Sequence, residues 1–318
     1  MNNSLRTLGF CVLLMAAPRS FAQNPERVTL FPRLDVGQTL HYQIGYRAKT
    51  NTTTISSVAA PMAPTGGQAD SQLLLQVEVE DLTLEAGKPA ARLRTRIIAQ
   101  AQDAVASGDS QKSATPDREV EFLLHHDGQV TDLNGLDKLS ADEKTAWREW
   151  VARFGDGAAF PERGIKPGDK WKSEEPITNA LLSGLSWEKE SVYVKDSPCA
   201  ARMASPQSDI AADEPPQETC AVILTTATIK QKSNQKDATP EDYKLHDLRN
   251  MGVAKGTNEI VTYISLKTGL VVRATEDASQ SLNAIVAKSD ASNRVHYLID
   301  AESHAQIVLL AEPPPTHP

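Results

Sequence analysis

The residues that could carry out chemistry are few and lie far apart along the chain. His125 and His126 are adjacent, but neighbouring side chains of a strand point to opposite faces and do not readily share a metal ion. Asp213 and Glu214 lie in a Pro-rich stretch, whereas acid–base catalysis needs carboxylates on a rigid support. We therefore predict no metal site and no cofactor, and we name no catalytic residue.

The short motifs that mark common active sites are also missing from the sequence. It contains no G-x-S-x-G, no H-E-x-x-H, no phosphate-binding Gly-Lys-Ser/Thr loop and no G-x-G-x-x-G. A formal net charge of −8 argues against nucleic acid as a partner, since nucleic-acid-binding domains present a basic surface. We expect a non-enzymatic protein, and a hydrolase with a dispersed site remains the alternative.

The first 22 residues have the features of a secretory signal peptide. Arg6 precedes an apolar run from Leu8 to Ala17, and Ser20 and Ala22 stand at the small-residue positions of a cleavage site. A transmembrane helix needs about 20 apolar residues, and no later stretch approaches that length. The sequence thus predicts export to the periplasm or the medium.

Cys199 and Cys220 are the two cysteines that remain after removal of the segment containing Cys11. An even pair in an exported protein predicts a disulfide. Two free thiols are the alternative, and no further ligands stand at a zinc-like spacing.

Four aromatic residues are candidates for the wall of a cavity. Trp171, Trp187, Tyr42 and Tyr46 stand in segments that we expect to be strands. If a cavity lies between the sheet and a helix, these side chains should line it. Their other interpretation is filling of the core, which is the commoner use of large aromatic side chains.

Alternation of apolar and polar residues predicts strands over most of the chain. Residues 71–84 and 91–97 each place apolar residues on one face. Folded as a hairpin, their other faces carry rows of opposite charge, Glu78 and Glu80 against Arg92, Arg94 and Arg96. An anion site at the arginine row is the alternative interpretation.

Two stretches resemble each other and suggest an internal repeat. "FPRLDVGQTL" (31–40) and "FPERGIKPGDKW" (160–171) share a Phe-Pro pair and a glycine, Gly37 or Gly168, before a strand. Hairpin glycines follow in the same order, Gly128 and Gly269, and their alignment places Phe122 over Tyr263 and Leu123 over Ile264. We predict two β-meander units of related plan, residues 25–136 and 160–312, with coincidence as the alternative.

One amphipathic helix is expected between the two units, within residues 137–159. Ser140 and Glu143 form a capping box. Trp147, Trp150, Val151 and Phe154 follow at helical spacing and form one apolar stripe. The stripe should pack against the sheet.

The expected fold is mainly β, with two antiparallel meander units that form a curved or half-barrel-like sheet joined by this helix. Four polar stretches, 49–70, 103–117, 197–219 and 231–257, are expected to be irregular. The Pro-rich tail, 313–318, is expected to be disordered.

The segment 160–171, with its Gly-Asp-x-Trp run, and the Thr268-Gly269 hairpin resemble exported bacterial β-rich proteins of unknown function. A looser similarity is to periplasmic lipoprotein carriers, which implies an apolar ligand. Neither resemblance supplies catalytic residues. We therefore expect a cell-envelope binding or scaffolding protein with an unidentified envelope partner, or alternatively a carrier of an apolar ligand in a sheet–helix cavity.

Overall fold

The computed structural model of the chain describes residues 26–57, 63–85, 87–101, 118–125, 130–154, 160–161, 163–177, 180–199 and 218–311. The predicted signal peptide, the tail 313–318, the hairpin at Gly128 and the carboxylates Asp213 and Glu214 lie outside these residues. None of the helices in the described part is long and apolar enough to cross a membrane.

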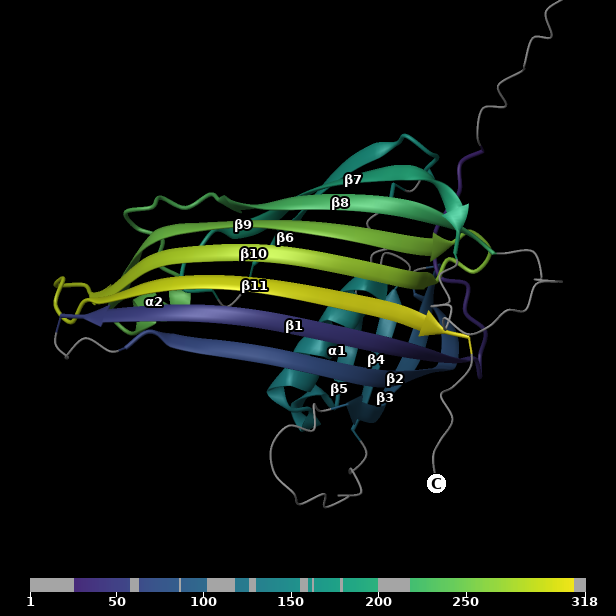
Figure 1. Cartoon of the computed structure of the whole chain (residues 1–318), viewed down its shortest axis with the longest axis horizontal. Coiled ribbons are helices and arrows are strands. Elements are labelled where there is room, and N and C mark those ends of the chain that lie inside the picture. Colours follow the sequence, from purple (N-terminus) through teal and green to yellow (C-terminus); the bar gives the residue numbers. More distant parts are fainter. Residues whose placement is uncertain are drawn as a thin grey trace, which may run out of the picture.

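The described strands form one continuous antiparallel sheet in the order β5-β4-β3-β2-β1-β11-β10-β9-β8-β7-β6 (Figure 1). The expectation of a mainly β protein is confirmed. The first strand pairs with the last at the centre of the sheet. The strands are β1 (Thr39–Ser56), β2 (Thr65–Glu85), β3 (Lys88–Ala101), β4 (Glu119–His125), β5 (Val130–Asn134), β6 (Lys170–Pro176), β7 (Leu185–Pro198), β8 (Thr219–Gln231), β9 (Leu248–Ser265), β10 (Val271–Lys288) and β11 (Val295–Leu310).

The alternation of side chains gives the sheet two different faces. On β1, Leu40, Tyr42 and Ile44 are buried, whereas Arg47 and Lys49 are exposed. The helix α1 (Ala141–Phe154) packs on the first of these faces and contacts β1, β2 and β10. We call this the inner face and the opposite one the outer face.

Three parts of the stretches expected to be irregular are in fact strands. Residues 49–56 belong to β1 and pair with β11, residues 65–70 belong to β2 and pair with 47–52 of β1, and residues 248–257 belong to β9. These segments contain few large apolar residues, so their periodicity is weak. Their strand structure comes from the long neighbouring strands, which supply hydrogen bonds and cross-strand contacts.

The helix α1 is fixed to the sheet by polar and aromatic contacts. Ser140 and Glu143 exchange the two hydrogen bonds of a capping box. The buried Glu143 also pairs with Arg118, just before β4. Trp147 donates from Nε1 to Thr95 Oγ1 at 3.0 Å, and Trp150 packs edge-on against Tyr42.

The N-terminal strap, residues 26–38, crosses one end of the sheet. Gly37 N donates to Val79 O on β2, and Arg33 N donates to Thr268 O in the β9–β10 hairpin. Further upstream, Arg27 donates to Gly164 O and Asp169 before β6. The strap therefore links strands from both halves of the sheet.

The other end of the inner face is covered by segments 180–184 and 232–247, the latter containing α2 (Glu241–Leu245). Leu182 packs there against Ala254 and Ala284. Asn250 N and Asn250 O are bound by Thr239 and Ala238, which fixes this covering to β9. A short 3₁₀ helix, η1 (Leu136–Lys138), connects β5 to α1.

Phe122 and Tyr263, which the alignment on Gly128 pairs, lie on opposite faces of the sheet. Phe122 is buried on the inner face, whereas Tyr263 lies on the outer face beside Arg273. A shift of one residue moves a side chain to the other face of a sheet. Both neighbours of Tyr263, Thr262 and Ile264, are buried.

Candidate functional site

The four candidate aromatic residues share the inner face but do not come together. The register places Tyr42 and Tyr46 on β1, and Trp171 and Trp187 on β6 and β7. Four strands, β11, β10, β9 and β8, separate the two pairs. The sheet order therefore does not bring the four aromatic residues together in one ligand wall.

Tyr42 and Trp171 contribute to the core. Tyr42 is 0% exposed, with its ring 5.8 Å from that of Trp150. Burial raises the pKa of its hydroxyl well above the ordinary value. Trp171 packs edge-on against Phe160 at 5.3 Å. These contacts correspond to the core-filling interpretation of both residues.

Residues that could bind a metal ion do not gather in the described part of the chain, where no group of three His, Cys, Asp or Glu side chains is close enough. His125 instead lies 2.6 Å from Thr131 Oγ1 and 3.3 Å from Glu85. The structure joins Cys199 and Cys220 in a disulfide, with their Cα atoms 4.9 Å apart. That bond connects the end of β7 to the start of β8.

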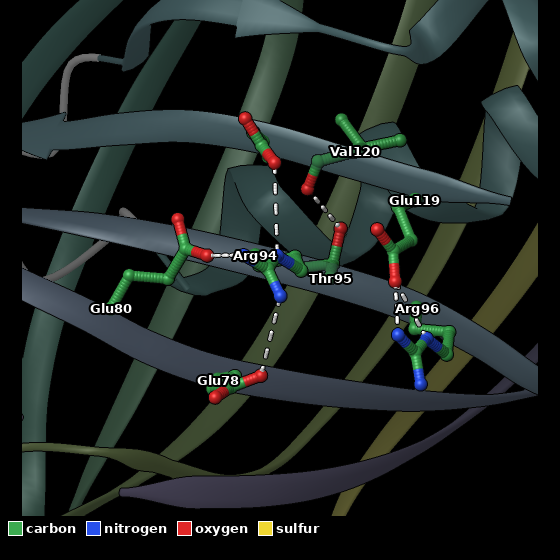
Figure 2. Close-up of polar contacts among 8 residues, drawn as sticks. Glu78, Glu80, Arg94, Thr95, Arg96, Glu119 and Val120 are labelled. Atoms are coloured by element: carbon green, nitrogen blue, oxygen red, sulfur yellow. Dashed lines mark hydrogen bonds and ion pairs between the residues drawn. The ribbon is translucent and has the colours of Figure 1, made fainter. Parts of the chain in front are cut away.

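The outer face of one flank carries paired charges rather than a free arginine row. Figure 2 shows Arg94 between Glu78 and Glu80 of β2, and Arg96 beside Glu119 of β4. The expected pairing of the glutamate row with the arginine row is confirmed at Arg94, whereas Arg92 pairs with Asp132 on β5 and Arg96 with Glu119 on β4. The arginines are thus occupied by carboxylates, which disfavours the alternative of an anion site.

The opposite flank, formed by β6, β7 and β8, is arranged in the same way. Lys230 donates to Glu188 at 2.7 Å, and this hydrogen bond raises the pKa of the lysine. Lys232 pairs with Glu174 and lowers the pKa of that carboxyl. Several charges on both flanks of the outer face are therefore paired with one another, although the exposed Lys170 and Lys195 make no ion pair among the described residues.

The centre of the outer face contains a groove of about 630 Å³. Its lining forms two rows that cross β9, β10, β11, β1 and β2, with a floor between them. The first wall is Arg47, His304 and Asp277; the second wall is Gln68, Lys49, Glu302, Ser279 and Thr257; the floor is Ala48, Ala69, Ala278 and Ser303.

This lining shows on which face the groove opens. The wall residues all have the outward orientation and are exposed. Inner-face neighbours of Ala48, such as Tyr46 and Thr50, do not line it. The floor residues point their small side chains inward, so the bottom of the groove is backbone. We call this feature the outer groove.

The charges of the outer groove are separated along its length. Arg47 and Lys49 stand on opposite walls over Ala48 on β1, and Asp277 and Glu302 stand on β10 and β11. Arg47 uses Nε to bind Asp70 at 3.1 Å, and His304 binds Asp277 at 2.8 Å. Within the described residues, Lys49 and Glu302 make no ion pair, although they are direct cross-strand neighbours.

A second depression, of about 500 Å³, lies further along β9, β10 and β11, which are three of the five strands that the outer groove crosses. Ser281 and Asn283 line it together with Lys255, Leu298 and Asp300. The two depressions together follow the outer side of β10 from Asp277 to Asn283. Short side chains on β10, between longer ones on β9 and β11, produce this hollow.

Sequence reasoning did not find the outer groove. Its residues come from five strands, and two of the segments involved were expected to be irregular. The alternation of short polar residues in "EDASQSLN" (276–283) is the one local signal. Only the strand order shows that these residues lie beside Arg47 and Lys49.

Comparisons with known proteins assign no family. No family profile matches the chain, and no curated protein matches it. Among solved structures, a candidate lipoprotein from Parabacteroides distasonis is 8% identical, with a TM-score of 0.27, covering 89% of this chain and 98% of that one. An outer membrane channel from Pseudomonas putida F1 is 10% identical, with a TM-score of 0.18, covering 88% and 98%. Such low scores carry no argument about function.

Proposed function

We propose that the protein is an exported cell-envelope binding or scaffolding protein, without enzymatic activity, that presents the outer face of its central strands to a polar partner. The observation that carries this proposal is the difference between the two faces. The inner face is covered by α1 and the strap at one end and by segments 180–184 and 232–247 at the other. The outer face of β9, β10, β11 and β1 is exposed and hollowed.

Charge pairing on the flanks supports this assignment of the binding surface. Many charged side chains on β2–β4 and β6–β8 already form ion pairs with one another. A partner that contacted these paired side chains would have to break their ion pairs. Lys49 and Glu302 in the centre, which make no ion pair among the described residues, can contact a partner without that cost.

The alternative function, an apolar-ligand carrier, would use a cavity between sheet and helix. Tyr42, Trp147 and Trp150 fill the space below α1 and are at most 2% exposed. The two depressions described above lie on the outer face; the first has a polar rim, and the second is lined by Lys255, Ser281 and Asp300 together with Val253 and Leu298. These observations favour a binding surface over an enclosed apolar site.

An internal repeat is also part of the proposal. Gly37 and Gly168 both have positive φ, 82° and 91°. Each donates its N–H to a neighbouring strand, to Val79 O or Tyr193 O, and a β-bulge follows that acceptor in both cases. Shared turn, hydrogen bonds and bulge support two units of related plan, residues 25–136 and 160–312, with the helix between them.

Site-specific photo-crosslinking in the producing cell tests the binding surface. A photoreactive residue at Ser281, in the second depression, should give a discrete crosslinked product in the envelope fraction. The matched control is the same residue at Lys172, which is also exposed but lies on β6. Crosslinks from Lys172 alone, or from neither position, would contradict the proposal.

Export is tested separately, on the mature protein. N-terminal sequencing should show that residues 1–22 have been removed, so that the chain starts at Gln23. Recovery of the protein with Met1 intact from the cytoplasm would refute an envelope function.

A further inference from the structure

The outer groove has the size and charge pattern of a site for an extended chain. It crosses five strands, and four inter-strand spacings amount to about 19 Å. That length matches about six residues of an extended peptide. The backbone floor is already hydrogen-bonded within the sheet, so the walls must supply recognition.

The wall charges select a ligand that carries both signs. Arg47 and Lys49 lie on the two walls over Ala48, two residues apart along β1. Arg47 binds Asp70 through Nε. Its terminal nitrogen atoms make no hydrogen bond with the described residues and can contact a ligand. An acidic group at this point would contact two cations at once.

Two carboxylates that could bind a cationic group lie one and two strands away from β1. Glu302 on β11 and Asp277 on β10 reach the same groove, and only Asp277 has a described partner, His304. The separation between these carboxylates and β1 is about 5–10 Å from strand spacing. In an extended peptide, side chains at i and i+2 share one side and stand about 7 Å apart.

We infer that the outer groove binds an extended peptide segment in which a basic and an acidic residue are separated by one residue. The acidic side chain sits between Arg47 and Lys49, and the basic one lies over Glu302 and Asp277. This inference rests on the proposed function and names the chemistry of its partner. Because exposed ion pairs are individually weak and screened by salt, we expect an affinity on the order of 1 mM for a short peptide.

The test is an NMR titration of the exported, disulfide-bonded protein with the blocked peptide acetyl-Gly-Lys-Gly-Glu-Gly-amide. The amide signals of floor residues Ala48, Ala278 and Ser303 should shift, and the affinity should fall several-fold between low salt and about 0.15 M salt. Replacing the Lys or the Glu of the peptide by Gln should weaken binding about two- to fivefold, since each sign has its own partner.

A charge exchange in the protein provides the matched control. The double variant Lys49→Glu with Glu302→Lys keeps the net charge, affects only exposed side chains and should abolish the shifts. The same exchange on the flank, Glu188→Lys with Lys230→Glu, should leave them unchanged. Equal binding by both double variants would overturn the assignment.

Two further outcomes separate this inference from the proposed function. Phosphoethanolamine that binds while the peptide does not would overturn the peptide assignment and point to a headgroup. If the peptide fails although Ser281 crosslinks in the envelope, the ligand assignment falls and the proposed function stands. Absence of crosslinks from the outer face refutes the proposed function itself.

Discussion

Trp150 is the largest fully buried side chain of the described residues, and it joins α1 to the sheet. Its ring packs against Tyr42 at 5.8 Å and against Phe122 at 6.1 Å, so one side chain contacts strands from two parts of the sheet. Replacing a buried Trp by Ala typically costs about 3–5 kcal/mol. Trp150→Ala should therefore lower the urea midpoint sharply.

The half-buried Trp187 provides the control for that measurement. Trp187→Ala removes a side chain of the same type from β7 and should cost clearly less. An unchanged midpoint for Trp150→Ala would mean that the helix does not dock on the sheet in solution.

Glu143 is a buried carboxylate whose ion-pair partner is Arg118. It is 1% exposed and paired with Arg118. Arg118→Ala leaves a buried carboxylate unpaired, and because Arg118 is partly exposed we expect a loss of about 1–3 kcal/mol. Adding Glu143→Gln should restore part of the loss, since Gln still completes a capping box. Urea unfolding of the single and double variants measures this, and equal stability of the two would contradict it.

At the scale of the elements, the turns before β1 and β6 depend on glycine for the same reason. Gly37 and Gly168 adopt left-handed backbone, and a Cβ at either position would meet nothing within 4 Å. Ala at each site should thus cost only the backbone penalty, about 1–2 kcal/mol. Gly45 on β1 also has open space but no positive φ, so Gly45→Ala should be neutral. Thermal unfolding of the three variants measures these losses of stability. A loss at Gly37 alone would argue against equivalent turns.

The sequence predicts the elements best where one face is apolar. Leu73, Leu75, Val77 and Val79 show the alternation of β2, and the capping box of α1 is visible at Ser140 and Glu143. It fails at residues 49–56, where threonines stand on both faces, and at 248–257, where the inner face carries the small residues Gly252, Ala254 and Gly256, so both segments show little periodicity. There, long-range pairing decides the structure.

For the whole molecule, the pairing of β1 with β11 is the feature that the sequence could not reveal. It makes one sheet of both halves and creates the outer groove from Arg47, Lys49, Glu302 and Asp277. No local pattern near either strand encodes this contact. The candidate site was therefore missed, whereas the aromatic residues chosen instead lie on the covered face.

The disulfide adds stability to the molecule at one end of the sheet. Cys199 and Cys220 are 21 residues apart, and closing a loop of that size is worth about 3 kcal/mol on the chain-entropy model. The exported protein should resist alkylation until it is reduced and denatured, and the double variant with Ser at both positions should unfold at lower urea. Two thiols that react in the folded protein would contradict the bond.

The most direct test of the central claim is hydroxyl-radical footprinting of the protein in isolated envelopes and in buffer. The oxidation rates of exposed and half-buried side chains report which face a partner covers. We predict slower oxidation of His304 and Met251, on the outer face, in envelopes, with Trp187 and Tyr46 on the inner face unchanged. Protection of Trp187 and Tyr46 with His304 unaffected would contradict the account and favour a ligand on the inner face.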